Sequence, residues 1–443
     1  MSVILSARFG RTGAVRACLR LCVVRKSRLA PKKQPSTYAM EYFDSFYGKA
    51  FGLDAWRQVR IALLSKKKYC AVVNPFSMTE DLIEKMRSLG CREVIGQHSG
   101  IEASKTLPTV QMTELPPPMP DILQKKKNLA VFEDSYRLIE KGKTEPLSSF
   151  VPATEMIYQE AVVNDEKYFN FLKPEKGSEI ALKTYQPLPL LPLLIYTFPT
   201  GVIKDFPVPR KPISGLFEYY LMDAASLLPV MALDIKPGDD FADFCAAPGG
   251  KTLAVAFMQR ARTHFCSDIS PSRVQRLKGI IKNYVPRESR KNIIIKQKDM
   301  TLISDDLTYD KILVDVPCSN DRHSLGEEEN NLYHPIRNSE RLAIPEKQKA
   351  ILTHALCRLR VGGVTVYSTC SLSPVQNDSV VHMTLQSFKR MKFVVTDLTE
   401  TFKPFADQKL YQFYNKCRYG QLVMPSLPNN YGPMYVCRIE RVK

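Results

Sequence analysis

The sequence predicts an α/β fold built on a mostly parallel, doubly wound sheet. From Gly215 onward, short apolar runs alternate with longer segments of helical periodicity. The connections between these segments are short, which is typical of parallel strands joined by crossover helices. The chain has 443 residues, of which 44% are apolar, enough for two or three domains with sizeable cores.

The residues before Gly215 divide less clearly. Apolar side chains recur at helical spacing over 41–64, which predicts one or two amphipathic helices. Two Pro-rich stretches, 108–120 and 187–212, mark loops or linkers, and we expect 129–185 to be partly helical. The expected organisation is a presequence over 1–36, a smaller, partly helical N-terminal region over 37–212 and the sheet-forming domain over 213–443.

Within the sheet-forming domain, the elements are expected in a regular order. Helices are expected at 216–228, 251–260, 271–284, 346–359 and 375–388. Strands are expected at 240–244, 263–267, 293–297, 311–315, 365–368, 393–397 and 434–439. Because ligands bind beyond the carboxyl ends of the strands in such sheets, we expect the functional site there.

The formal charge of +18 suggests a polyanion partner such as nucleic acid, or an anionic membrane surface. Half of this charge lies in the first 40 residues, which hold six Arg, three Lys and no acidic residue. Interspersed apolar residues make this leader typical of an amphipathic organelle-targeting presequence, cleaved near 26–36. A basic, RNA-binding tail is the alternative.

Two other classes of protein are not favoured. The most apolar stretch, 188–198, is short and contains Pro189 and Pro192, so no membrane span is expected. The 11 cysteines include no CxxC pair and no Cys/His cluster at zinc spacing, so we expect neither a disulfide framework nor a metal site. The remaining question is whether single cysteines carry chemistry.

The first strand of the predicted sheet leads into the string DFCAAPGGKT. Gly249 and Gly250 let the backbone approach a ligand closely, and Lys251 opens the next helix. A Walker A loop needs glycine where Cys245 stands, and the dinucleotide pattern G-x-G-x-x-G is absent. The string therefore does not predict a phosphate-binding loop.

Acidic residues follow the next two strands. Asp268 ends the second strand, where a carboxylate accepts hydrogen bonds from ribose hydroxyls, and Arg273 lies one turn into the following helix. Asp299 follows the third strand, at a position to meet an adenine amino group. Either acid alone could be a helix cap. Together with the glycine turn they indicate a nucleoside ligand without a pyrophosphate, a description that S-adenosylmethionine fits.

Cysteines follow the fourth and fifth strands. Cys318 comes three residues after Asp315, and Cys370 follows Ser368-Thr369. These strand ends are neighbours in a doubly wound sheet, so both thiols can reach one cavity beside the cofactor. Either cysteine alone could be a small buried apolar residue, but the pair favours function, because a thiolate is the natural nucleophile for C6 of a pyrimidine.

The residues at the strand ends carry a resemblance to a known family. The strings DFCAAPGGKT, SDISPSR, DVPCSNDRHSL and VYSTCSLSPVQND resemble the Sun (Fmu/RsmB) family of RNA 5-methylcytosine methyltransferases, which have a Rossmann-like fold and use S-adenosylmethionine. The strings FDSFYGKAFG, GLFEYYLMDAASLLPV, DRHSLGEEENN and NNYGPMYVCRIERV resemble its mitochondrial small-subunit rRNA branch. The resemblance implies mitochondrial small-subunit rRNA as substrate, a matrix location, a part in ribosome assembly and a helical-repeat partner of the transcription-terminator family.

The resemblance also implies the roles of individual residues. Cys370 would add to C6 of cytosine, so that C5 can attack the sulfonium methyl group. Asp315 would hold the N3/N4 edge of the cytosine and lie near the methionine amine. Cys318 would help to remove the C5 proton and release the product by elimination. The cofactor would be bound by Gly249, Gly250, Lys251, Asp268, Arg273, Asp299 and Asp315.

One segment departs from the family pattern. Many relatives have Glu-Asn-Glu after the nucleophile motif, whereas this chain has Gln376-Asn377-Asp378, so an acid/base role of the leading carboxylate does not transfer. Two alternatives to the rRNA methyltransferase remain. One is an rRNA-binding assembly factor in which methylation is dispensable, and the other is a mitochondrial tRNA methyltransferase.

Overall fold

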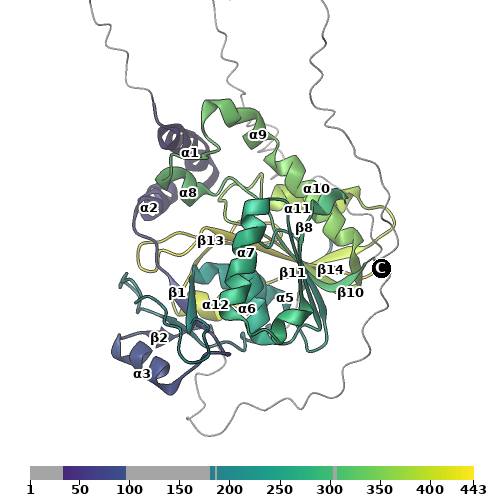
Figure 1. The fold of residues 1–443 in the computed structure, drawn as a ribbon. Helices are drawn as coiled ribbons and strands as arrows, with labels where there is room; N and C mark the ends of the chain where they lie inside the picture. Colours follow the sequence, from purple (N-terminus) through teal and green to yellow (C-terminus); the bar gives the residue numbers. More distant parts are fainter. Residues whose placement is uncertain (1–32, 96–179, 185–186, 303–306) are drawn as a thin grey trace, which may run out of the picture.

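The computed structural model describes residues 33–95, 180–184, 187–302 and 307–443 (Figure 1). The predicted presequence lies outside the described residues except for its last four, and so do the Pro-rich stretch 108–120 and most of 129–185. The division at 36 and 212 therefore stays a prediction.

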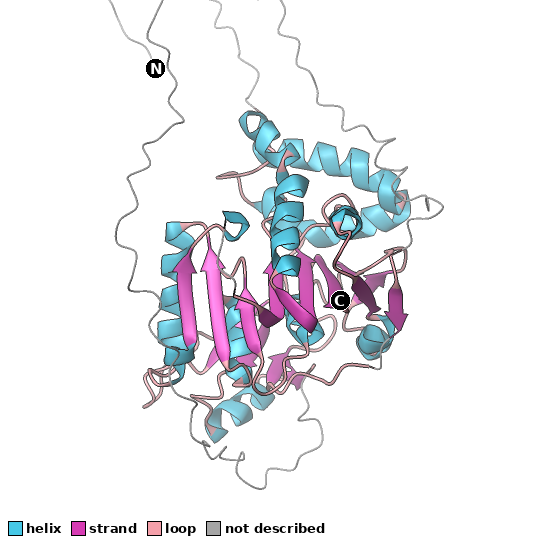
Figure 2. Cartoon of the chain, turned by 90° about the vertical axis from the view of Figure 1, so that its right-hand side faces the viewer, coloured by secondary structure: helices cyan, strands magenta, loops and turns pink. Residues whose placement is uncertain are grey.

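A 10-stranded sheet forms the centre of the molecule (Figure 2). Its middle is parallel, as the sequence predicts, with neighbours in the order β10 (Leu359–Thr369), β9 (Tyr309–Asp315), β6 (Asp240–Asp243), β7 (Thr263–Asp268) and β8 (Ile293–Gln297). This α/β arrangement confirms the predicted fold class. The carboxyl ends of all five strands point to one edge, where the candidate residues were expected.

Antiparallel strands extend the sheet beyond β10. The strand β14 (Met434–Arg441) pairs antiparallel with β10, and two further strands, β13 and β11, pair with β14. The last strand of the sheet in chain order therefore lies inside the sheet. The remaining strands on this side are β11 (Phe393–Asp397), β12 (Gln412–Tyr414), β13 (Gln421–Met424) and β3 (Leu182–Thr184).

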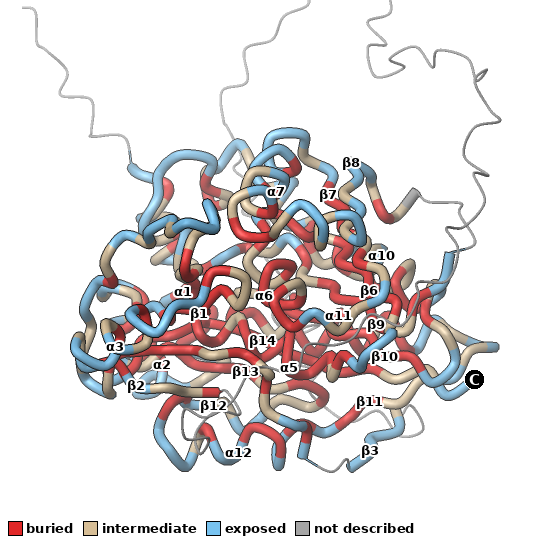
Figure 3. The backbone as a smooth tube through the Cα atoms, turned by 60° about the horizontal axis from the view of Figure 1, so that its bottom comes forward, coloured by how far each residue is buried: buried red, intermediate tan, exposed pale blue. Residues whose placement is uncertain are grey.

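Helices cover both faces of the sheet, so its central strands are buried on both sides (Figure 3). On β9, Leu313 packs into one core cluster, whereas Ile312 and Val314 pack into another, as the alternation of side chains along a strand requires. The Leu313 face is covered by α5 (Leu227–Leu233), α6 (Gly250–Met258), α7 (Pro271–Tyr284) and α12 (Thr399–Asp407). The opposite face is covered by α10 (Ile344–Cys357), α11 (Asp378–Ser387) and the first two helices of the chain.

Those first two helices confirm the helical prediction for 41–64. They are α1 (Pro35–Phe51) and α2 (Leu53–Leu64), separated at Gly52, whose φ of 88° favours glycine. Phe43, Tyr47 and Trp56 pack against one another, and Phe43 also packs against Tyr333 of the sheet-forming domain. The N-terminal helices are thus part of the same core as the sheet.

A second, four-stranded sheet has the order β2 (Arg92–Glu93), β4 (Ile195–Thr197), β1 (Cys70–Val73) and β5 (Tyr219–Met222), with α3 (Glu80–Ser88) between β1 and β2. The predicted helix at 216–228 is wrong, because β5 occupies its centre and pairs with β1. The helix starts later, where Asp223 accepts a hydrogen bond from the backbone N of Ala225 at 2.9 Å and begins η3 (Ala224–Ser226). Strand β1 is distant from β5 in sequence, so no local sequence pattern predicts this pairing.

The other predicted helices are found as α6, α7, α10 and α11, with ends shifted by a few residues. Two short helices not predicted from the sequence, α8 (Asp321–Gly326) and α9 (Asn338–Leu342), follow β9. The 3₁₀ turns are η4 (Ser289–Asn292), η5 (Met300–Leu302) and η6 (Pro335–Arg337). None of the helices formed by the described residues is long and apolar enough to cross a membrane.

Candidate active site

The turn between β6 and α6 requires its glycines. Gly249 has a φ of +120°, and a Cβ added there would lie 2.7 Å from Cδ1 of Leu277 on α7. A Cβ at Gly250 would lie 3.3 Å from Cε1 of Tyr220. The turn therefore packs closely between two elements, and only glycine provides the backbone conformation of position 249.

A cavity of about 420 Å³ opens beside this turn, at the ends of β7 and β8. Asp268, 2% exposed, lies in its wall and accepts hydrogen bonds from the backbone N of Ala247 at 3.3 Å and of Ser270 at 3.0 Å. Arg273 forms an ion pair with Asp268 at 3.2 Å and donates to the carbonyl of Ala247. Other lining residues are largely apolar: Phe244, Ile269, Met300, Pro317, Leu332 and Ile344.

Asp299 lines the same cavity. Its Oδ1 accepts hydrogen bonds from the backbone N of Thr301 at 2.9 Å and from its Oγ1 at 2.6 Å. These bonds fix the carboxylate at the start of η5. Asp299 thus serves as a local cap, the structural role that the sequence left open, and it also faces the cavity.

A larger cavity of about 700 Å³ lies on the other side of the strand ends. Four residues, Cys245, Arg273, Pro317 and Cys318, line both cavities, so the two spaces share one wall. Every site residue predicted from the sequence lines one or both cavities. Those in the larger one are Gly249, Gly250, Lys251, Arg273, Asp315, Cys318 and Cys370, and those in the smaller one are Asp268, Arg273, Asp299 and Cys318.

An ion pair stands in the wall of the larger cavity. The Nζ of Lys251 lies 2.7 Å from Oδ2 of Asp315, whose Oδ1 accepts a hydrogen bond from Ser368 Oγ at 2.8 Å. Burial alone would lower the pKa of Lys251, but the Asp315 carboxylate, with a smaller contribution from Cys370, raises the pKa above its usual value. Lys251 is therefore a fixed cation close to both the carboxylate and the thiol.

The two strand-end thiols are in direct contact. The Sγ atoms of Cys318 and Cys370 lie 3.2 Å apart, at the ends of the neighbouring strands β9 and β10. The hydrogen bond to Cys370 and burial both hold the pKa of the Cys318 thiol well above its usual value. The Cys318 thiol therefore keeps its proton at neutral pH, and either sulfur can be the donor in the contact.

A buried carboxyl lies behind the glycine turn. Asp243 is 1% exposed and accepts hydrogen bonds from Thr252 Oγ1 at 2.7 Å and from the backbone N of Cys245 at 3.4 Å. Burial raises the pKa of Asp243 to about 7, with a smaller effect of the Asp315 charge in the same direction. This group titrates close to neutrality within the cavity wall.

The departure at Gln376 has a structural explanation. Its Oε1 accepts from the backbone N of Ser319 at 3.0 Å, and its Nε2 donates to Ser319 Oγ at 3.0 Å. A neutral amide supplies the acceptor and the donor together, which an ionised carboxylate does not. The residue therefore holds the turn directly after Cys318, and an acid/base role is not needed to explain it.

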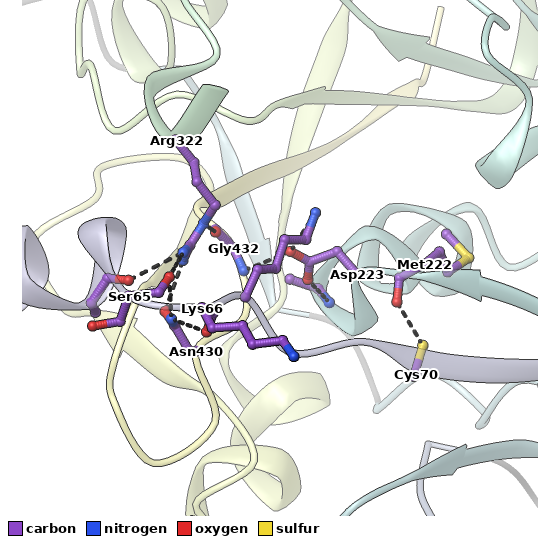
Figure 4. A network of polar contacts seen from close by, with 11 residues as sticks. Ser65, Lys66, Cys70, Met222, Asp223, Arg322, Asn430 and Gly432 are labelled. Carbon is purple, nitrogen blue, oxygen red and sulfur yellow. Dashed lines mark hydrogen bonds and ion pairs between the residues drawn. The ribbon is translucent and has the colours of Figure 1, made fainter. Parts of the chain in front are cut away.

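Part of the wall comes from segments that sequence analysis did not assign to the site. Arg322 lines the larger cavity and donates to the carbonyl of Gly432 at 2.9 Å and to Asn430 Oδ1 at 2.8 Å (Figure 4). Lys67 and Tyr69, from the connection between α2 and β1, line it as well. Arg322 follows Cys318 by four residues, within the string DVPCSNDRHSL. Nothing local in the sequence marks Lys67 and Tyr69, which precede β1 and approach the site through the pairing of β1 with β5.

Comparisons with known proteins agree with this geometry. A family model described as 16S rRNA methyltransferase RsmB/F matches residues 230–436. The 5-cytosine rRNA methyltransferase NSUN4 of Xenopus laevis is 36% identical over 427 residues, which are 93% of this chain and 92% of that protein. The mitochondrial tRNA (cytosine(34)-C(5))-methyltransferase of Danio rerio is 35% identical over 263 residues, covering 57% of this chain and 68% of its own.

Among solved structures, a methyltransferase homologue from Pyrococcus horikoshii covers 93% of this chain and 99% of its own, with a TM-score of 0.50 and 17% sequence identity. This likeness supports the fold. The likeness to NSUN4 extends through the N-terminal region as well as the sheet. The chain therefore belongs to the Sun/RsmB family of RNA 5-cytosine methyltransferases.

Proposed function

We propose that this enzyme transfers a methyl group from S-adenosylmethionine to C5 of a cytosine in mitochondrial small-subunit rRNA, through a covalent bond between Cys370 and C6. The observation that carries the proposal is the contact of Cys318 with Cys370 beside the Lys251–Asp315 ion pair. Cys318 lines both cavities and the other three side chains line the larger one, so adenosine in the smaller cavity and a target base in the larger one would meet at the thiols.

The smaller cavity fits the adenosine part of the cofactor. Its apolar lining suits a purine ring, Asp268 provides a carboxylate for ribose hydroxyls, and Asp299 provides an acceptor for an amino group. Gly249 and Gly250 allow the turn to pack closely against Leu277 and Tyr220 while its backbone lines the larger cavity. Lys251, Arg273 and Asp315 would hold the methionine end. When bound, S-adenosylmethionine supplies an electrophilic methyl group at a sulfonium.

The thiols divide the remaining chemistry between them. The thiolate of Cys370 forms a bond with C6 of the cytosine, which makes C5 nucleophilic toward the methyl group. After methylation, Cys318 takes the proton from C5 while its own proton passes to the sulfur of Cys370. The bond between Cys370 and C6 breaks as the C5–C6 double bond re-forms. Asp315 accepts a hydrogen bond from the cytosine N4 amino group. The proton retained by Cys318 before the reaction agrees with its contact to Cys370, because an S–H donor stabilises a neighbouring thiolate.

The larger cavity is open enough for a base that has left its stack. Reaching C5 and C6 requires an unstacked cytosine, which costs a few kcal/mol in a duplex and less in an RNA loop or bulge. Tyr69 and Lys67 line this cavity, and the Lys67 ammonium lies 5.1 Å from the centre of the Tyr69 ring. These residues would contact the nucleotide or its neighbours.

The likeness to rRNA enzymes favours rRNA over tRNA as substrate. The relatives named as rRNA methyltransferases match 93% of the chain, including the N-terminal helices that pack on the active-site region, whereas the tRNA relative matches 57%. The basic leader supports import into the mitochondrial matrix. The proposal includes a contribution to ribosome assembly and a helical-repeat partner that helps to bind the RNA.

The decisive experiment is bisulfite sequencing of mitochondrial RNA from cells with and without the protein. Loss of one methylated cytosine in the small-subunit rRNA, restored by the wild-type protein and not by Cys370→Ala, is the expected result. Loss of methylation only from a tRNA would show that the substrate is tRNA rather than rRNA. No change in the methylation of any RNA would contradict the activity. A reporter fused to the first 40 residues tests the location, and a cytosolic reporter would contradict import.

A further inference from the structure

One buried carboxylate connects the two cysteine loops. Asp321, the first residue of α8, has an exposed fraction of 0%. Its Oδ1 accepts a hydrogen bond from Ser319 Oγ at 2.6 Å, and its Oδ2 accepts one from the backbone N of Leu372 at 2.7 Å. Ser319 follows Cys318 directly, and Leu372 lies two residues after Cys370.

The serines beside the two cysteines complete this connection. Ser371 Oγ lies 3.2 Å from Oδ1 of Asp321 and 2.8 Å from Ser319 Oγ. Asn320, whose φ of 46° is a conformation that asparagine tolerates better than most residues, turns the chain so that Asp321 faces back toward the second loop. The carboxylate is therefore bonded to a residue immediately next to each thiol.

The same carboxylate reaches the N-terminal region. The hydroxyl of Tyr47, on α1, donates to Oδ2 of Asp321 at 2.7 Å, although 274 residues separate the two in sequence. Tyr47 is itself fully buried among the aromatic side chains of α1 and α2. Figure 1 shows α1 and α8 side by side.

The donors to Asp321 are neutral. Every hydrogen bond that this carboxylate accepts within the described part of the chain comes from a hydroxyl or a backbone amide. Burial raises the pKa of Asp321, and these hydrogen bonds act in the opposite direction. A buried charge without a cation is costly. We therefore attribute the role of the Asp321 carboxylate to the several fixed donors whose hydrogen bonds it accepts at once.

We propose that Asp321 is a positioning residue that sets the geometry of the two catalytic thiols, and that Tyr47 extends this support to helix α1. The proposal rests on the proposed function in that it treats both thiols as catalytic. It adds a reason for the packing of the N-terminal helices on the catalytic domain. Through Tyr47, the first helix of the described chain holds the carboxylate that aligns Cys318 with Cys370.

A chemical probe can report the thiol geometry without any RNA. Diamide oxidises two neighbouring thiols to a disulfide and is itself reduced to the hydrazine, taking up both protons and both electrons. In the full-length protein, the rate of Cys318–Cys370 disulfide formation is measured by mass spectrometry of the linked peptides. We expect Asp321→Ala to slow this reaction about tenfold or more, because the loops then no longer share an acceptor.

Asp321→Asn is the conservative rescue. Its amide oxygen can still accept from Leu372 and Tyr47, while its NH₂ group can donate to the serine hydroxyls, which rotate freely. We therefore expect Asn to restore most of the disulfide rate. An Asn variant as slow as the Ala variant would contradict a role in geometry.

The chain offers a matched control. Asp378 is also buried and accepts hydrogen bonds from backbone amides and from a tyrosine hydroxyl, that of Tyr435, but its donors hold the 418–420 loop. Asp378→Ala should lower the melting temperature and leave the disulfide rate within about twofold of wild type. Equal slowing in the Asp378 and Asp321 variants would mean that the effect is general loosening, and it would overturn the proposal.

A milder pair of variants is Tyr47→Phe with Tyr435→Phe as its control. Each removes one tyrosine hydroxyl that donates a hydrogen bond to a buried carboxylate. In methyl transfer, Tyr47→Phe should lower kcat several-fold at an unchanged KM for S-adenosylmethionine, and it should slow disulfide formation in parallel. Tyr435→Phe should change neither. If Tyr47→Phe left both rates at the wild-type value, α1 would have no part in thiol geometry. Since the diamide rate needs no substrate, it separates failure of this proposal from failure of the proposed activity.

Discussion

The Sγ atom of Cys318 lies 3.2 Å from that of Cys370, although 52 residues separate them in the chain. The contact follows from the parallel pairing of β9 with β10, which places Asp315 opposite Ser368 and brings the two strand ends to the same edge of the sheet. In the proposed mechanism, this contact lets one thiol act on a base that the other has already bound. The predictions below test this arrangement and its surroundings.

Replacing Cys370 by Ser should reduce methyl transfer by roughly a thousandfold or more, because a hydroxyl is a far weaker nucleophile than a thiolate at neutral pH. The measurement is incorporation of a labelled methyl group into RNA. Cys357→Ser is the control, since this exposed cysteine lies at the end of α10 and should keep wild-type activity. A Cys370→Ser enzyme with normal turnover would rule out the covalent mechanism.

Replacing Cys318 by Ala should trap the enzyme on its RNA. The Cys370–C6 bond still forms, but the proton on C5 is no longer removed, so release by elimination is slow. The adduct is expected as a slowly migrating band in a denaturing gel. It should disappear in the Cys318→Ala/Cys370→Ala double variant, and a band that persists there would show that another residue is the nucleophile.

Asp268→Asn should weaken cofactor binding about tenfold or more, because a hydrogen bond to a charged acceptor contributes about 1.5–3 kcal/mol. Calorimetric titration with S-adenosylhomocysteine measures the change. Asp240→Asn is the matched control, since Asp240 is also buried but lies at the opposite end of β6, paired with Arg262 and Arg360. Equal weakening in both variants would indicate a loss of folding rather than of a ligand contact.

Asp243 should make stability depend on pH near neutrality. Burial raises its pKa to about 7 in the folded enzyme, whereas an unfolded aspartate titrates at about 3.9. Between these values the unfolded chain releases a proton that the folded chain keeps, so the contribution of Asp243 to the free energy of unfolding falls as pH rises from about 4 to about 7. The stability of Asp243→Asn relative to wild type should therefore increase as the pH rises from 5 to 8.

Denaturant unfolding at pH 5 and pH 8 and constant ionic strength provides the measurement. Asp240→Asn is again the control. Burial acts to raise the pKa of Asp240, but hydrogen bonds from Thr263, Arg360 and Arg262 outweigh burial and hold the pKa below its usual value. Its contribution is complete above about pH 4 and is lost only in more acidic solution. A pH dependence of the same size in both variants would contradict the assignment to Asp243.

The candidate site could be predicted from the sequence because its signals are local. Each of Asp268, Asp315 and Cys370 follows a short apolar run and precedes a turn, and the parallel sheet brings such positions together. The helix predicted at 216–228 failed for the opposite reason. Strand β5 forms only because it pairs with β1. The hydrogen bond from the Cys70 thiol to the carbonyl of Met222 joins residues that are 152 apart in the chain.

The role of Asp321 could not be predicted from local sequence patterns, for the same physical reason. Its position after Cys318 resembles that of any helix-starting aspartate, and its importance depends on Leu372 and Tyr47, which are 51 and 274 residues away. No periodicity or spacing encodes contacts of that range. Sequence analysis thus located the candidate catalytic groups, and the tertiary structure was needed to find the residues that hold them.

The position of β14 has a consequence for how the chain is made. This strand is the last of the sheet in chain order, yet it lies between β10 on one side and β11 and β13 on the other. During synthesis, β10 keeps an exposed edge until residues 434–441 have left the ribosome, and such edges promote aggregation. A nascent chain of this enzyme is therefore expected to need chaperone protection until residues 434–441 have emerged, and a shortened chain without β14 should accumulate as insoluble material.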